Sequence, residues 1–334
     1  MGDTIDLGAV PRSSAIVYGM RLIRQPFVQR LVRAALVGFG VMAIAFALLH
    51  FIPGDPVEIL LGDQATPELV VHYRALLGLD GSIAEQFGRY LGGVVRGDLG
   101  TSITTGARVN DIIYRAMPIT LWLIVVTIVM AIVLALPLAI AAAIYRHTWF
   151  GHVFRVGTSI LLATPVFYSG LLMLLFFAIQ LRVAPVAGYD GDFPANLRYL
   201  WLPALTLCGV MVPITARVLQ SSINETLEQE FVESAIVRGL GTLPYLWRYL
   251  LRPSLAPTIS LLGYMIGQLL SAAVVVELVF NLPGIGISLI VEGVLVRDYP
   301  VVQGIVLVLG LIVVMVSFAA DVVSGWLDPR TKTT

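Results

Sequence analysis

Long stretches without a single Asp, Glu, Lys or Arg dominate the hydrophobic pattern of the chain. A helix needs roughly 20 apolar residues to cross the hydrocarbon core of a bilayer, and each of six such stretches reaches or approaches this length. The pattern therefore predicts an all-α, polytopic membrane protein with six transmembrane helices. The predicted spans are residues 34–54, 117–145, 156–181, 199–216, 253–276 and 299–320.

Prolines lie inside several of these spans, at Pro137, Pro165, Pro203 and Pro213. Proline breaks a helix in water, but in a membrane the neighbouring helices can satisfy the carbonyl groups that it leaves free. We therefore expect kinks at these positions. Kinked helices often line transport pathways, which makes Pro165 a candidate pathway residue.

Composition agrees with a membrane protein. Hydrophobic residues make up 58% of the 334 residues and charged residues 13%, against about 45–50% and 25% in soluble domains. The 21 basic and 21 acidic residues cancel, so nucleic acid is not an expected partner. Residues 1–30 lack the apolar core of a signal peptide, and we expect the first span to be a retained anchor.

Basic residues predict the orientation, because cytoplasmic loops close to spans are enriched in Lys and Arg. With both termini in the cytoplasm, thirteen of the 21 basic residues lie inside. Residues 1–33 are then a cytoplasmic segment, 55–116 an external segment, 217–252 a cytoplasmic loop and 321–334 a cytoplasmic tail. The thirteen are Arg12, Arg21, Arg24, Arg30, Arg33, Arg146, Arg155, Arg217, Arg238, Arg248, Arg252, Arg330 and Lys332.

The external segment carries helix start signals of its own. Thr66 precedes Pro67, a proline suited to the first turn of a helix. Ser82 with Glu85 three residues later forms a capping box ahead of an apolar run. We expect two or three short amphipathic helices on the outer membrane face.

The cytoplasmic loop has an apolar stripe at every fourth position, at Ile223, Leu227, Phe231 and Ala235. This spacing predicts one amphipathic helix, which Gly239 is suited to end. A second helix is expected at residues 243–251 and should stop near Pro253, since proline cannot continue a helix interior. The product is a helical hairpin between two membrane spans, which either conveys force into the bilayer or is an ordinary loop at the membrane surface.

A sequence resemblance gives this hairpin a function. The stretch ESAIVRG at residues 233–239 resembles the Glu-Ala-Ala-three-residues-Gly signature of binding-protein-dependent ABC transporter permeases. In that family the signature loop forms the coupling helix that seats in a groove of the ATPase subunit. Ser234 departs from the signature. The coupling residues that the resemblance implies are Phe231, Glu233, Ser234, Ala235, Arg238, Gly239, Leu240, Arg252 and Pro257.

Other short segments of the sequence resemble segments that recur in the dipeptide/oligopeptide (peptide/nickel) branch of the family, and in its first permease subunit type. They are FIPGDP at 51–56, GDLG at 97–100, LRPSLAP at 251–257 and DYPVVQG at 298–304. Pro253 departs from the branch, which usually has asparagine there. The resemblance implies the type I ABC importer permease fold, with a permease core at 117–325, in a bacterial or archaeal cytoplasmic membrane.

The same resemblance implies the partners. They are a second homologous permease, two ATP-binding subunits or a homodimer of one, and an extracytoplasmic substrate-binding protein that delivers a di- or oligopeptide. ATP and Mg²⁺ would be used by the ATPase subunits, and this chain would bind no cofactor. Nickel complexes or glutathione remain alternative cargoes.

Catalytic chemistry inside the chain is not expected. A phosphate-binding loop of the Walker A type needs a lysine, and the only lysine is Lys332, close to the end of the sequence. His50, His72, His147 and His152 form no metal-ligand pattern, and no hydrolase motif occurs. We therefore predict a non-catalytic subunit without a metal site.

Charged residues at membrane depth are scarce, which argues against the main rival, a stand-alone ion-coupled transporter. Glu277, near the end of the fifth span, either lines the pathway and meets a substrate amine or is paired locally. Asp298 bounds the sixth span and is also a candidate pathway residue. Gly263 and Gly267 form a small-residue pair that favours close helix packing inside the bundle, and residues 281–286 predict a turn.

Overall fold

The computed structural model describes residues 31–47, 57, 61–62, 65–76, 80–190, 194–238, 241 and 245–327. These residues are mainly helical, and the pairing of Thr101 with Arg108 is an isolated β-bridge. The all-α class predicted from the sequence is confirmed.

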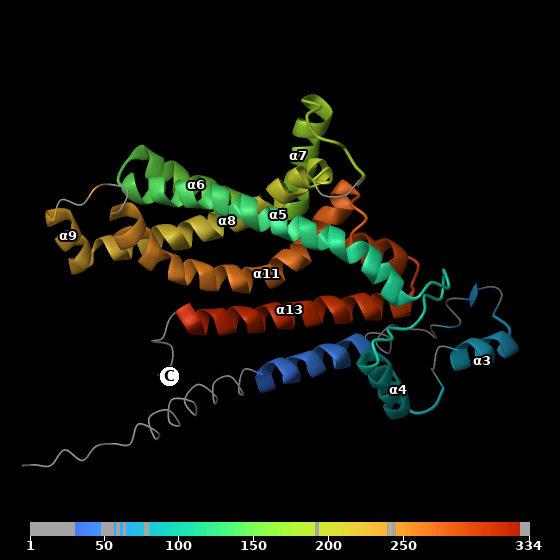
Figure 1. Cartoon of the computed structure of the whole chain (residues 1–334). Coiled ribbons are helices and arrows are strands. Elements are labelled where there is room, and N and C mark those ends of the chain that lie inside the picture. Colours follow the sequence, from blue (N-terminus) through green and yellow to red (C-terminus); the bar gives the residue numbers. More distant parts are fainter. Residues whose placement is uncertain are drawn as a thin grey trace, which may run out of the picture.

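Four long helices form the bundle and lie side by side in Figure 1. They are α5 (Val109–Ile144), α8 (Leu197–Leu227), α11 (Arg252–Phe280) and α13 (Tyr299–Leu327), and each contains a segment long and apolar enough to cross a membrane. The stretches predicted as the second, fourth, fifth and sixth spans coincide with parts of these helices. The helices extend beyond those stretches, and α8 continues to Leu227, because charged residues end an apolar run without ending a helix.

The predicted third span is not one straight helix. Helix α6 (Trp149–Ala163) is followed by α7 (Val166–Met173) and the π-helix η2 (Leu174–Gln180), with a bend of 103° between the two halves. Thr164 and Pro165 at the break are extended. Proline disfavours helical geometry in the residue before it and donates no hydrogen bond. The kink predicted at Pro165 is confirmed, whereas α5 and α8 continue through Pro137, Pro203 and Pro213.

The predicted first span is described only in part. A helix at Leu31–Ala47 lies beside α13, and a side chain at Gly310 of α13 would collide with Val41. Residues 48–54 of the predicted span, and residues 1–30, lie outside the described residues. Within the described part of the chain, four helices are long and apolar enough to span a membrane, or five if the bent pair counts as one span.

Small side chains let the helices of the bundle approach closely. Ala131, Ala135, Ala139 and Ala142 form a buried row on α5, in the same hydrophobic core as residues of α8. In α11, added methyl groups at Gly263 and Gly267 would press on Ala320 and Val313 of α13. The predicted role of the glycine pair in bundle packing is confirmed. Cys208 is likewise a small buried side chain.

Two short helices, α3 (Pro67–Leu76) and α4 (Ile83–Val95), lie at the end of the bundle opposite helix α9 (Glu230–Val237) in Figure 1. We call these the α4 end and the α9 end. The predicted capping box is confirmed, because Ser82 N–H donates to Glu85 Oε2 at 2.8 Å and Glu85 N–H donates to Ser82 Oγ. Phe87 of α4 meets Phe46 edge-to-face and Tyr90 meets it in a tilted arrangement, at centroid distances of 5.2 and 5.8 Å.

Residues 281–298, which we call the return segment, connect α11 to α13 at the α4 end. The predicted turn at 281–286 is present, but the helical stretch that follows it was not predicted. That stretch comprises α12 (Ile285–Ile287) and the π-helix η4 (Ser288–Val294). Its apolar run is too short to stand out as a span, and no capping side chain marks its start.

Candidate coupling and pathway sites

The predicted coupling helix is divided between two helices. Ile223 and Leu227 belong to the end of α8, whereas Phe231 lies on α9. The break falls between them, where Gln229 N–H donates to Thr226 O at 3.1 Å and Val232 N–H donates to Gln229 O at 3.0 Å. The prediction of one continuous helix was wrong. Apolar residues at every fourth position indicate that they share one face of a helix, but this spacing does not reveal a turn between them when the intervening residues also favour helix.

Helix α9 packs with one edge and presents another to its surroundings. Val232 is 1% exposed, whereas Phe231 is 44% and Val237 82% exposed. Ser234 and Arg238 are also exposed. Gly239 and Leu240, and the side chains of Glu233 and Ala235, lie outside the described residues. The visible part of the predicted coupling set therefore combines accessible apolar and basic side chains at the α9 end.

The second arm of the predicted coupling region runs straight into helix α11. The π-helix η3 (Tyr245–Leu251) is followed without a break by α11, and Pro253 sits in the first turn of α11. The predicted stop near Pro253 was wrong. Pro253 donates no hydrogen bond to the preceding turn, yet the helical backbone continues through it at the junction of η3 and α11. Arg252 and Pro257 are exposed on this continuous element.

Hydroxyl groups join the two arms at their base. Thr226 near the end of α8 and Ser254 in α11 share a hydrogen bond of 2.9 Å, and Ser254 also donates to Leu250 O at 2.7 Å. Both hydroxyl-bearing residues are buried. These hydrogen bonds therefore hold the end of α8 against the start of α11.

Arg217 and Gln220 fasten α8 to its neighbours at the same end. The Arg217 guanidinium donates to Thr158 Oγ1 at 2.8 Å and to Ser159 Oγ at 2.6 Å, and the Gln220 amide donates to Ala142 O at 3.0 Å. Sequence reasoning counted Arg217 only as a cytoplasmic charge. Its acceptors are 58 and 59 residues away along the chain, so no local motif revealed them.

Glu277, a candidate pathway residue, is fully buried at the other end of α11. Its Oε1 accepts from the Thr120 hydroxyl of α5 at 2.5 Å, and its Oε2 accepts from the Gly286 N–H at 2.6 Å. The alternative of a locally paired carboxylate describes this geometry. That Glu277 contacts the cargo remains a prediction.

Asp298, the second acidic candidate, is also fully buried. Its Oδ2 accepts from Ser102 Oγ at 2.6 Å, from Thr104 Oγ1 at 2.8 Å and from Thr104 N–H at 3.0 Å. Its Oδ1 accepts from Val301 N–H in the first turn of α13. Asp298 therefore fastens the loop before α5 to the start of α13.

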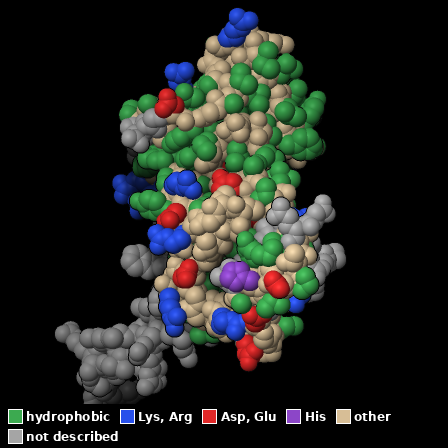
Figure 2. All heavy atoms as spheres, turned by 90° about the vertical axis from the view of Figure 1, so that its right-hand side faces the viewer, with side chains coloured by type: hydrophobic (Ala, Val, Ile, Leu, Met, Phe, Trp, Pro, Cys, Tyr) green, Lys and Arg blue, Asp and Glu red, His purple; other side chains and the backbone are tan. Residues whose placement is uncertain are grey.

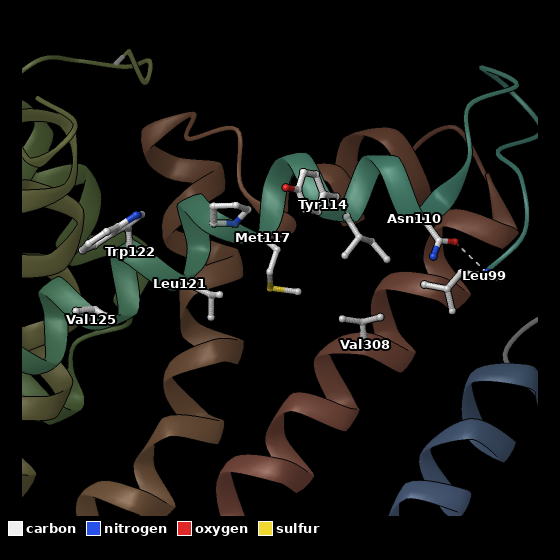
Figure 3. Close-up of a pocket in the computed structure, with 10 residues that line it drawn as sticks. Leu99, Asn110, Tyr114, Met117, Leu121, Trp122, Val125 and Val308 are labelled. Carbon is white, nitrogen blue, oxygen red and sulfur yellow. Dashed lines mark hydrogen bonds between the residues drawn. The ribbon is translucent and has the colours of Figure 1, made fainter. Parts of the chain in front are cut away.

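A groove of about 740 Å³ lies between α5 and α13 near the α4 end. Figure 3 shows Met117 and Leu121 on the side of α5 that faces Val308 of α13. The side-chain amide of Asn110 at its rim is already hydrogen-bonded within the chain, because it accepts from Leu99 N–H and donates to Gly97 O. The lining is apolar and contains none of the predicted pathway residues. Pro165 lies at the bend between α6 and α7 instead.

The α4 end has two distinct halves. Figure 2 looks onto this end and shows charged side chains gathered over its lower half, with hydrophobic side chains prevailing above. Such a division is typical of a surface that lies partly in water and partly in lipid. Among the described residues, no three His, Cys, Asp or Glu side chains come together to hold a metal ion.

Comparison with known proteins matches two family descriptions over most of the chain. Residues 135–333 match the binding-protein-dependent transport system inner membrane component, and residues 23–124 match the N-terminal part of such membrane components. The first match covers more than half of the chain and includes α8, α9, α11 and α13.

Individual relatives match over nearly their whole length. The probable D,D-dipeptide transport system permease protein of Escherichia coli (strain K12) is 34% identical over 326 residues, covering 90% of this chain and 96% of the relative. The di/tripeptide transport system permease protein of Pseudomonas aeruginosa is 31% identical, covering 88% and 94%. The glutathione transport system permease protein of Salmonella paratyphi A is 31% identical, covering 87% and 94%.

Proposed function

We propose, from the premise that this chain belongs to the family of binding-protein-dependent transport system inner membrane components, that it forms half of the membrane pathway of a peptide importer. Members of this family are the membrane subunits of importers that work with a binding protein. The chain is accordingly a multi-pass transmembrane permease subunit. The family match is the observation that carries the proposal. The continuous connection of η3 with α11 suggests how movement at the coupling region would reach the membrane helices.

The α9 end faces the cytoplasm in this proposal. The exposed basic residues Arg238, Arg248 and Arg252 lie there, as expected for the cytoplasmic ends of spans. The opposite end, with α3 and α4, faces the binding protein. Both termini are cytoplasmic in this arrangement.

The surface formed by α9 and η3 receives the ATPase subunits. Phe231, Val237 and Trp247 are 44%, 82% and 60% exposed, at the end of the bundle that projects into water. Exposed aromatic and arginine side chains are the residue types that dominate binding energy at protein interfaces. ATP binding and hydrolysis in the partners would move this surface, and α11 would carry the movement into the membrane.

The remaining components follow from this role. A second, homologous permease completes the pathway, two ATP-binding subunits use ATP and Mg²⁺, and an extracytoplasmic binding protein delivers the cargo. The chain itself is non-catalytic and holds no cofactor. This assignment is supported by its single lysine, which stands far outside any phosphate-binding motif.

A di- or tripeptide is the proposed cargo. Two of the relatives are dipeptide or di/tripeptide permeases, and a third is a glutathione permease. These cargoes share amide bonds and a free carboxylate. Glutathione remains the second candidate because of the third relative.

Uptake by a strain that lacks only this chain tests the cargo. We expect uptake of a labelled dipeptide to fall to background and to return when the chain is restored. Labelled glutathione and ⁶³Ni²⁺ are measured in parallel. Unchanged dipeptide uptake together with lost glutathione or nickel uptake would contradict the peptide assignment.

A further inference from the structure

The carboxylate of Glu277 joins three elements that are distant in sequence. Its hydrogen bonds reach Thr120 of α5 at 2.5 Å and Gly286 of α12 at 2.6 Å, while the residue itself belongs to α11. It also accepts from the backbone of Ile287. Each oxygen of one buried carboxylate therefore holds a different part of the fold.

Thr120 completes the network. Its hydroxyl donates to Glu277 and accepts from Ile285 N–H at 3.0 Å. The Thr120 side chain is 2% exposed, so water does not substitute for these partners. α5, α11 and α12 are thus linked in a closed set of hydrogen bonds.

The return segment is seated tightly on this carboxylate. A methyl group at Gly286 would lie 2.5 Å from Val274 Cα and 2.8 Å from Glu277 Oε2, and one at Gly284 would collide with the Glu277 carboxyl group. Asn281, with a φ of 49°, turns the chain back toward α11. The return segment therefore has no room to slide over Glu277 while the Glu277 side chain keeps this position.

The two carboxyl oxygens of Glu277 face these groups at hydrogen-bond distance. A carboxylate offers two acceptor oxygens, whereas a glutamine amide offers one. Glu277 takes part in neither of the ion pairs found among the described residues. An ionisable side chain at membrane depth is costly and generally marks function, and here a hydroxyl and a backbone N–H hold the Glu277 side chain in place.

Glu277 also lies at the far end of the element that begins in the coupling region. α11 runs from Arg252, where η3 joins it, past Glu277 to Phe280. At 1.5 Å per residue, the distance along the helix from Arg252 to Glu277 is roughly 38 Å. One continuous helix therefore connects the coupling surface to the hydrogen-bond network at the opposite end.

We propose that Glu277 is a positioning residue that clamps the return segment to α5 and α11, so that movement of α11 driven from the coupling surface displaces the α4 end as one unit. This proposal rests on the importer function proposed above. Without the clamp, α11 would move without carrying the return segment, and ATP would be hydrolysed without import.

Four variants of the full importer, reconstituted in liposomes with its partners, test the clamp. Glu277→Gln and Thr120→Val each remove part of the network at nearly constant shape. Thr120→Ser keeps the hydroxyl. Thr127→Val is the matched control, because Thr127 is a buried threonine of α5 that donates only to Leu123 O of its own helix. The measured quantity is cargo imported per ATP hydrolysed.

We expect this ratio to fall about tenfold or more in Glu277→Gln and Thr120→Val, the scale of losing a hydrogen bond to a charged group. Thr120→Ser and Thr127→Val should keep the parental ratio. Parental ratios in both clamp variants would overturn the proposal. So would failure of both to assemble when the controls assemble, since the network would then be structural alone. ATP-independent uptake by the parental importer would instead refute the importer function.

Discussion

Replacing Phe231 with aspartate is expected to abolish ATP-driven import while the chain remains folded in the membrane. Phe231 is 44% exposed on α9, next to Val232, whose burial holds the helix in place. A buried aromatic anchor contributes about 2 kcal/mol or more to an interface, and aspartate would in addition bury a charge. Binding to the ATPase subunits should therefore weaken by more than about 25-fold.

The measurement combines uptake with recovery of the ATPase subunits on the purified chain. Phe231→Leu is the control, because it keeps an apolar side chain and should retain most of the import. Gly239→Val, which removes the residue expected to end the coupling helix, should also uncouple import. Parental import by the Phe231→Asp variant would contradict the assignment of α9.

Replacing Asp298 with alanine is expected to cause a large loss of stability. The carboxylate accepts from the hydroxyls of Ser102 and Thr104 and from the Thr104 backbone, and it lies at the start of α13. Its removal leaves these donors without their acceptor and frees the loop before α5. We expect a loss of about 2–4 kcal/mol, seen as a lower unfolding temperature in detergent.

Asp111→Ala is the matched control on the same side of the molecule. Asp111 pairs with Arg108 at 3.2 Å, but both side chains are more than half exposed, and such pairs contribute about 1 kcal/mol or less. Proteolysis of the loop at residues 97–108 should accelerate in Asp298→Ala alone. Equal unfolding temperatures for the two variants would show that Asp298 does not fasten the loop.

Local features of this chain were predictable from its sequence. The apolar stretches gave the long helices because the bilayer sets a minimum length. The capping box of Ser82 and Glu85 was predictable because its partners are three residues apart. The resemblance at residues 233–239 predicts where the coupling region lies, and this assignment stays a prediction.

Features set by distant partners were not predictable. Pro165 breaks its span while Pro137 and Pro203 do not, because neighbouring helices decide whether a proline is accommodated. The partners of Asp298 are 194 and 196 residues away, and Thr120 is 157 residues from Glu277. For that reason the sequence left open whether Glu277 meets cargo or is paired within the fold.

Uptake by liposomes that contain the purified chain, with and without its ATPase subunits, tests the central claim most directly. The account predicts that the complete assembly imports peptide only with ATP and the binding protein present. It also predicts that the chain alone accumulates nothing under a proton or sodium gradient. Gradient-driven accumulation by the chain alone would contradict the account.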